Sequence, residues 1–305
     1  MTKRVTNANV EGRSSMDSFK IIYEPKGRAR EYSPLAVNVY RGCLNACAYC
    51  YAPNVLHMDR AVFNSQVTEV PNLEERLEHD LNLLSEMRER GLETGRVLLC
   101  FTTDLFQPIV PEGMDDDFGL VVPRKVIALF NKYGVPYNIL TKNPGMALKM
   151  HEEIDKNLAW IGTTIATYDK ELEPNSEGVF ERAGSLQELK EAGFTTWVSF
   201  EPWLDEAPVE YIETISLVTT PYIPDFVRVG KVSRFPSKMT TDEQWTEEAD
   251  KLVDMMMDIN LPFYIKEDLR PHLKRHAGLK SYKMEPFDGY SDGVDFLESV
   301  TEGNR

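Results

Sequence analysis

The sequence predicts an α/β fold in which parallel strands alternate with helices, as a partial or full (β/α) barrel. Short runs of β-branched, aromatic and other apolar residues are typical of strands that are covered on both faces. Between these runs, apolar residues recur at spacings of three and four, as on one face of a helix. This alternation indicates βα units, and a doubly wound open sheet is the main competing arrangement.

The expected strands and helices follow one another along the chain. The strands are predicted at 37–41, 97–101, 137–141, 160–165, 196–200, 226–230 and 262–265. An apolar face from Leu73 to Met87 predicts the first long helix. Pro123 suits the first turn of a second helix, and Gly193 suits the C-terminal cap of a third. A fourth helix is expected after the capping candidates Thr240, Thr241 and Asp242.

The 305 residues fit one large domain with small appendages. We predict a basic N-terminal arm and lead-in at 1–36, a core at 37–270 and a tail at 271–305. Residues 1–42 carry a net charge of +4 in a chain whose net charge is −15. The arm could touch a polyanion whereas the acidic body repels phosphate backbones, so nucleic acid stays open as a partner. We also expect an exposed acidic loop at 111–119 and a loosely ordered segment at 286–305.

The composition of the chain predicts its compartment. No stretch approaches the roughly 18 to 20 apolar residues that span a bilayer, so no membrane contact is expected. The first fifteen residues lack the apolar region of a secretory signal. These features favour a cytoplasmic protein.

Three of the four cysteines, Cys43, Cys47 and Cys50, lie within eight residues. Without a secretory signal, such clustering indicates metal binding rather than disulfides. The spacings of three and then two residues allow one loop to hold several corners of an iron–sulfur cube. Three thiolates leave one iron of a four-iron cube open to a small ligand, and S-adenosylmethionine (SAM) can fill that place through its amino and carboxylate groups.

Other interpretations of the cysteines stay open. A zinc-stabilised binding module without catalysis would use His57 as the fourth ligand, but structural zinc sites usually pair two knuckles and the sequence offers one. A buried helix face fits the same spacing, although Gly42 and Pro53 disfavour a long helix there. A cluster-bearing protein that only transfers electrons is a further alternative.

The motif resembles that of the radical SAM superfamily, whose pattern is Cys-x3-Cys-x-aromatic-Cys, with Tyr49 at the aromatic position. The resemblance covers residues 19–270. Within the superfamily, residues 27–32, 38–42, 102–108 and 141–142 are similar to the spore photoproduct lyase-like group. Residues 199–202 and 262–266 resemble phage and archaeal radical SAM proteins without assigned reactions.

The resemblance implies an oxygen-sensitive [4Fe-4S] cluster on Cys43, Cys47 and Cys50, with SAM as the second cofactor. It implies reductive cleavage of SAM to a 5′-deoxyadenosyl radical, which abstracts hydrogen from a substrate. An electron donor such as flavodoxin or ferredoxin is expected as a partner. The substrate is expected to be a nucleobase or nucleotide, or a small polar metabolite.

Polar residues at strand ends are the further site candidates, because ligands bind at the carboxyl ends of parallel strands. Thr102 and Asp104 follow the second strand, Lys142 follows the third and Thr164 lies on the fourth. We expect the carboxylate of Asp104 to pair with the SAM ammonium, while the resemblance suggests Lys142 as the partner of the SAM carboxylate. It also suggests the backbone near Tyr49 as the contact to adenine. Ordinary turn formation is the alternative for each.

Later strands end in charged residues, Glu201, Lys231 and Lys266, which we expect to bind a polar substrate or to pair with one another. Cys100 lies on the second strand. The spore photoproduct lyase-like resemblance suggests that it donates hydrogen to a substrate radical, and a buried core cysteine is the alternative.

Overall fold

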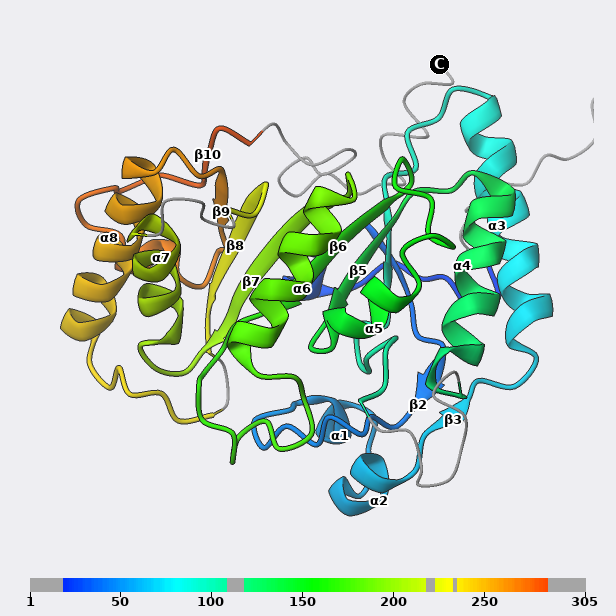
Figure 1. Ribbon diagram of the computed structural model, residues 1–305, viewed down its shortest axis with the longest axis horizontal. Helices are drawn as coiled ribbons and strands as arrows, with labels where there is room; N and C mark the ends of the chain where they lie inside the picture. Colours follow the sequence, from blue (N-terminus) through cyan, green and yellow to red (C-terminus); the bar gives the residue numbers. More distant parts are fainter. Residues whose placement is uncertain (1–18, 109–117, 218–222, 233–234, 285–305) are drawn as a thin grey trace, which may run out of the picture.

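The computed structural model describes residues 19–108, 118–217, 223–232 and 235–284 (Figure 1). Its main sheet runs in the order β1 (Leu35–Val37), β4 (Val97–Leu99), β5 (Tyr137–Thr141), β6 (Ala159–Thr164), β7 (Thr195–Trp203), β8 (Phe226–Lys231), β9 (Phe263–Ile265) and β10 (Ser281–Tyr282). All neighbours are parallel except β9 and β10, which are antiparallel. Because β1 and β10 form the two edges of the sheet, the predicted α/β barrel is confirmed in its partial form.

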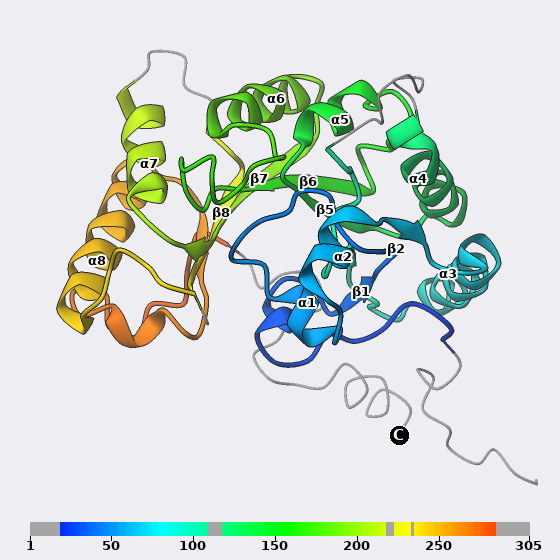
Figure 2. The ribbon, with the colours of Figure 1, turned by 90° about the horizontal axis from the view of Figure 1, so that it is seen from below.

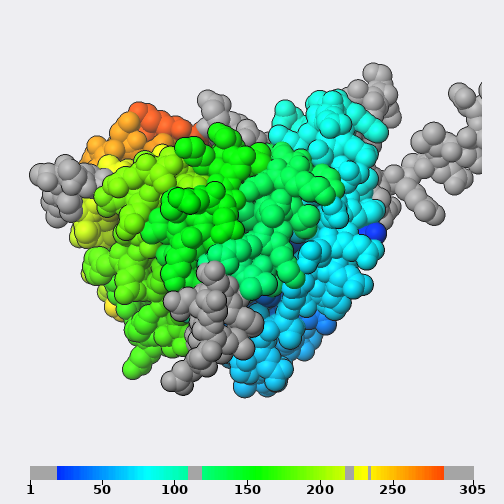
Figure 3. Space-filling model, turned by 45° about the vertical axis from the view of Figure 1, so that its right-hand side comes forward, coloured from blue at the N-terminus to red at the C-terminus, as the bar shows by residue number. Residues whose placement is uncertain are grey.

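Helices cover the outer face of the sheet. They are α3 (Leu73–Glu89), α4 (Val121–Tyr133), α5 (Pro144–Lys149), α6 (Val179–Glu191), α7 (Ala207–Leu217) and α8 (Asp242–Asp258). Figure 2 shows them as an arc, with α1 (Ala52–Val55) and α2 (Arg60–Ser65) on the opposite, inner side of the sheet. Short 3-10 turns lie at η2 (Gly27–Glu31), η3 (Phe118–Leu120) and η4 (Arg270–His272). Figure 3 shows α3 and α4 as part of a continuous outer surface.

The helix signals of the sequence have their expected roles. Leu73, Leu77, Leu81 and Leu84 are buried on α3. The Thr241 side chain accepts the backbone N–H of Gln244 and caps α8, while Gly193 follows α6 with φ of +94°.

The single strand predicted at 37–41 is wrong. The chain leaves the main sheet after Val37, and β2 (Tyr40–Arg41) pairs with β3 (Thr68–Glu69) in a separate antiparallel ribbon. Asn38 lies at the break. Its side chain bonds the hydroxyl of Tyr23 and the backbone N–H of Thr102, both at distances under 3.0 Å. These contacts direct the chain away from the sheet and towards the cysteine motif.

Part of the predicted N-terminal arm packs against the body. The buried carboxylate of Asp80 on α3 accepts the backbone N–H groups of Lys20, Ile21 and Ile22. Tyr23 then pairs with Ala36 of β1. Residues 1–18, the acidic segment 111–117 and the tail 286–305 lie outside the described residues, so the expectations about them stay untested.

The concave face of the sheet is filled by aromatic side chains. Trp197 stacks on Phe226 at 5.7 Å between ring centroids, and the Arg228 guanidinium lies 4.9 Å from the Trp197 ring. A side chain at Gly162 would place its Cβ 2.4 Å from Trp197, so this glycine makes room for the indole. Within the described ranges, no helix has the length and apolar character to cross a membrane.

Candidate cofactor and substrate site

A cavity of about 450 Å³ lies at the carboxyl ends of the strands. It is lined by residues from the loop that carries Cys43, Cys47 and Cys50 (the cysteine loop), from the strand ends and from η2. The twelve residues that the sequence assigned to the cluster, SAM or the substrate all line it: Cys43, Cys47, Tyr49, Cys50, Cys100, Thr102, Asp104, Lys142, Thr164, Glu201, Lys231 and Lys266. The strand-end argument therefore locates this site, while the role of each residue stays a prediction.

The cysteine loop lies tightly against α2. Gly42 has φ of +87°, and a Cβ on it would lie 2.0 Å from the carbonyl oxygen of Gln66. This close approach lets the backbone N–H of Cys43 donate to the carbonyl of Phe63 at 2.9 Å. Cys43 and Cys47 are buried, and Cys50 is partly exposed. The loop thus presents its three thiols to the cavity.

Arg60 supports the cysteine loop and was not foreseen from the sequence. Its guanidinium donates to the carbonyl of Cys50 at 2.7 Å and to that of Cys47 at 3.3 Å. A rigid guanidinium with several donors can fix two carbonyl groups at once. Arg60 thereby holds the second half of the motif and places a positive charge beside the thiols.

The connection from β6 to α6 holds the other side of the cysteine loop. Asn175 donates its side-chain amide to the carbonyl of Leu44 at 2.7 Å, and the N–H of Ala48 donates to the carbonyl of Leu172 at 2.9 Å. The Tyr49 hydroxyl donates to the carboxylate of Glu173. Backbone and side-chain contacts together therefore hold the motif in place.

Glu173 is the centre of a buried ionic group. The Lys142 ammonium lies 2.9 Å from one carboxylate oxygen, and Arg182 bonds the other. These two cations hold the pKa of Glu173 near 2 although burial raises it. Arg182 also donates to the carbonyl of Thr164 at 2.7 Å. Two cations therefore share the Glu173 carboxylate, and the carboxylate of Asp104 lies beside the backbone of Lys142.

Sequence reasoning missed Glu173 and Arg182, although a signal for Arg182 exists. It shares a helix face with Val179, Leu186 and Leu189, at the three- and four-residue spacing of buried positions. A charged residue on such a face requires a partner. Glu173 lies in a connection without periodicity, where no comparable signal exists.

Asp104 forms hydrogen bonds that stabilise a turn, which was the alternative to its predicted contact with SAM. One carboxylate oxygen accepts the Asn45 amide at 2.8 Å and the backbone N–H of Lys142 at 2.9 Å, and the other accepts the N–H of Phe106 at 3.0 Å. Burial raises the pKa of Asp104, and these hydrogen bonds oppose that shift. The residue ties the cysteine loop to the end of β5. A contact with the SAM ammonium stays a prediction.

Cys100 directly follows β4 and has φ of +65°. It is buried, as its alternative expects, yet it borders the cavity. Burial raises the pKa of its thiol to about 12, so the sulfur keeps its proton at neutral pH. A protonated thiol has a hydrogen to give, and the donor role stays a prediction.

Two of the three charged residues at the later strands pair with each other. The Lys266 ammonium donates to Glu201, which also accepts the Tyr32 hydroxyl at 2.5 Å. A Cβ at Gly230 would lie 2.9 Å from both Glu201 and Lys266, so the glycine leaves room for this pair. Lys231 instead lies 2.9 Å from the Nε2 atom of His272.

The residues fit the group that the motif implies. Three thiols border one cavity, and each can bind a separate iron of a cube and leave the fourth iron facing the open space. His57, the proposed zinc ligand, is exposed and is not among the lining residues. Among the described residues, no three His, Cys, Asp or Glu side chains are arranged to hold a single metal ion. The zinc alternative thus gains no fourth ligand from His57.

Known structures share this fold. A variant of spore photoproduct lyase matches with a TM-score of 0.58 and 14% identity, over 81% of this chain and 79% of that one. The same lyase complexed with dinucleoside spore photoproduct matches with a TM-score of 0.57 and 13% identity, again over 81% of this chain and 79% of that one. SuiB of Streptococcus suis bound to SAM matches with a TM-score of 0.53 and 11% identity, over 87% of this chain and 52% of that one. The fold is therefore that of radical SAM enzymes, and the predicted resemblance is confirmed at this level.

The sequence comparison assigns the family. The chain belongs to the family described as "Protein of unknown function (DUF5131)", whose model matches residues 29–277. No curated protein matches the sequence.

Proposed function

We propose that this protein is a radical SAM enzyme that holds a [4Fe-4S] cluster through Cys43, Cys47 and Cys50 and binds SAM in the adjoining cavity. One observation carries the proposal: the three thiols of the motif border the same cavity as the strand-end polar residues, on the fold of radical SAM enzymes. The SAM-bound SuiB structure supports SAM as the second cofactor.

The two cations around Glu173 suit the methionine carboxylate of SAM. Lys142 lines the cavity, and Arg182 lies behind it on the same carboxylate. Because Lys142 shares its carboxylate partner with Arg182, the carboxylate of SAM would form a further charge-assisted hydrogen bond with the Lys142 ammonium. This bond would offset part of the desolvation cost of burying the ammonium. Thr102, Thr164 and Tyr49 line the same cavity. We propose the two threonine hydroxyls as contacts to the ribose and the backbone near Tyr49 as the contact to adenine.

When bound, the cluster and SAM supply a 5′-deoxyadenosyl radical through one-electron reductive cleavage, with flavodoxin or ferredoxin as the electron donor. The chain itself positions these groups and excludes water. Arg60 and Glu173 fix the motif. We further propose that the Cys100 thiol, which borders the cavity, returns a hydrogen atom to a substrate radical. The substrate is a nucleobase, a nucleotide or a small polar metabolite.

The test is anaerobic reconstitution with iron and sulfide, followed by dithionite and SAM, with 5′-deoxyadenosine measured by mass spectrometry. We expect a brown protein that forms 5′-deoxyadenosine. A colourless protein that retains zinc and leaves SAM intact would refute the enzyme. An intact cluster without SAM cleavage would leave an electron-transfer protein.

The four cysteines provide a matched set of variants, because all of them border the cavity. Cys43→Ala, Cys47→Ala and Cys50→Ala should each lose bound iron and sulfide. Cys100→Ala should retain both, since its thiol is outside the motif. Iron retained in any variant of the first three, or lost in Cys100→Ala, would contradict the assignment of the ligands.

A further inference from the structure

The cavity has an unusual balance of charge for so acidic a chain. The net charge of the protein is −15. Two carboxylates line the cavity, Asp104 and Glu201, against five cationic side chains, Lys26, Arg28, Lys142, Lys231 and Lys266. Lys26 and Arg28 are exposed, whereas Lys142, Lys231 and Lys266 are partly or fully buried, and buried like charges are costly unless a partner compensates them. Lys142, Lys266 and Arg28 pair with Glu173, Glu201 and Asp268, whereas the ammonium of Lys231 contacts the imidazole of His272.

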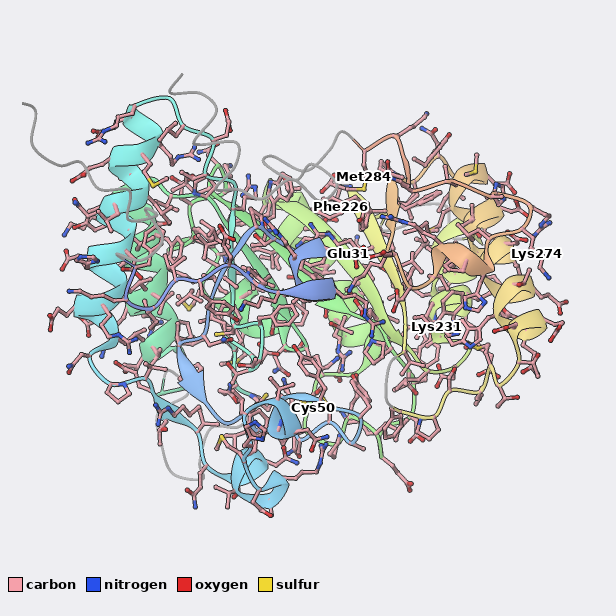
Figure 4. The ribbon with its side chains drawn as sticks, turned by 180° about the vertical axis from the view of Figure 1, so that it is seen from behind. Glu31, Cys50, Phe226, Lys231, Lys274 and Met284 are labelled. Carbon is pink, nitrogen blue, oxygen red and sulfur yellow. The ribbon has the colours of Figure 1, made fainter. Side chains whose placement is uncertain are left out.

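We propose that Lys231, supported by Arg28, binds an anionic group of the substrate, either a phosphate or a carboxylate. This inference rests on the proposed function and names the substrate class of the same cavity. Lys231 ends β8, whereas Asp104, Lys142 and Thr164 follow or end β4, β5 and β6. Figure 4 shows Lys231 and Cys50 on separate elements of the chain. The strand order therefore sets the two ligand positions apart.

The pair of Glu201 and Lys266 does not neutralise Lys231. Lys266 is almost fully buried and donates to Glu201, and its ammonium lies 4.0 Å from Glu31. The Tyr32 hydroxyl donates to the same oxygen of Glu201 that Lys266 contacts. The carboxylate thus already has two donors.

Lys231 has neutral neighbours instead. Its ammonium lies 2.9 Å from Nε2 of His272 and 4.8 Å from the centre of the Trp245 ring. Burial and the charge of Lys231 lower the pKa of His272, which favours a neutral imidazole that accepts from the ammonium. The other groups that act on His272 are two carboxylates, Asp242 at 3.9 Å and Asp268.

Asp268 neutralises the guanidinium of Arg28 and does not pair with the ammonium of Lys231. It pairs with the guanidinium of Arg28 and lies 3.4 Å from the backbone N–H of Lys231. The exposed side chain of Asp242, 87% accessible, is screened by water. The positive charge that stays uncompensated is therefore that of Lys231, whose ammonium contacts His272 and Trp245. An ammonium with three donors, of which the imidazole takes one, can bind a phosphate or carboxylate oxygen with those that remain.

The probe is inorganic phosphate in one arm and acetate in the other, titrated calorimetrically into the reconstituted full chain at constant ionic strength. Saturating SAM occupies the Lys142 side, so that the titration reports on the second position. We expect saturable binding of at least one probe at one site per chain. Binding of phosphate alone indicates a phosphorylated substrate, and binding of acetate alone indicates a carboxylate.

Variants locate the site. Lys231→Met should weaken binding roughly tenfold or more, as expected for the loss of one hydrogen bond to a charged group. Lys231→Arg keeps the charge and should stay within a few-fold of the wild type. Lys274→Met is the matched control, because Lys274 is exposed and is not among the lining residues (Figure 4).

Two results would overturn the inference: no saturable binding of either probe to the wild type, or equal binding to wild type and Lys231→Met. The formation of 5′-deoxyadenosine is measured on the same wild-type sample. A sample that cleaves SAM but binds neither anion refutes the anion site alone, whereas one that leaves SAM intact refutes the proposed function.

Discussion

Replacing Gly42 with alanine tests whether close packing against α2 places the cysteine motif. The new Cβ would lie 2.0 Å from the oxygen of Gln66 and 3.0 Å from that of Phe63, on a backbone with φ of +87°. The left-handed backbone alone costs about 1 to 2 kcal/mol. Relieving the clash must move the loop away from α2 and break the bond from Cys43 to Phe63, which adds about 2 to 3 kcal/mol. The expected loss of stability is therefore about 3 to 5 kcal/mol.

Gly91→Ala is the matched control. Gly91 has φ of +79°, and a Cβ there would meet no atom within 4 Å, so this variant should lose only about 1 to 2 kcal/mol. Stability is measured by denaturant unfolding followed by circular dichroism, and cluster loading by bound iron and sulfide after reconstitution. Compared with the wild type, Gly42→Ala should have lower stability and bind less iron and sulfide, whereas Gly91→Ala should have lower stability only. Equal stability losses with full iron loading in both variants would refute the reasoning.

Three carboxylates give further predictions, each checked by unfolding measurements. Burial raises the pKa of half-buried Glu177 to about 7, so the folded protein loses stability as the pH rises from 4.5 to 7 and this carboxyl group has to ionise. Glu177→Gln should therefore be more stable than the wild type by about 2 kcal/mol at pH 8 and equally stable below pH 4.5. Cations lower the pKa of Glu173 to about 2, so Glu173→Gln should lose about 3 kcal/mol at pH 7, with a gap that shrinks as pH falls from 4.5 towards 2. Asp80→Ala should lose about 3 kcal/mol and expose residues 20–22 to hydrogen exchange. Each idea fails if its variant matches the wild type at every pH.

The parallel fold made much of the site predictable. Buried strands give continuous apolar runs, and their carboxyl ends must meet at one edge of the sheet. For this reason Asp104, Lys142 and Glu201, which are far apart in sequence, could be assigned to one place before the structure was known. The cysteine motif was predictable because its ligands lie within eight residues of one another.

The supporting contacts were not predictable for the opposite reason. Arg60 lies on a six-residue helix, and Glu173 lies in a connection between β6 and α6, so neither position has a periodic pattern. The break in the predicted first strand depends on Asn38, whose partners Tyr23 and Thr102 lie far from it in sequence. Partners of this kind are fixed only by the folded arrangement.

The shared carboxylate of Glu173 has a consequence for the assembly of the two cofactors. The same group accepts Tyr49 from the cysteine motif and holds Lys142 at the proposed SAM site. Binding of the cluster orders the motif and binding of SAM engages Lys142, so both events act on the Glu173 carboxylate. The binding free energies of the cluster and of SAM are therefore linked. Linkage is reciprocal, so a cluster that strengthens SAM binding is itself held more firmly once SAM has bound. In air, saturating SAM should then slow the loss of iron from the wild type more than from Glu173→Gln.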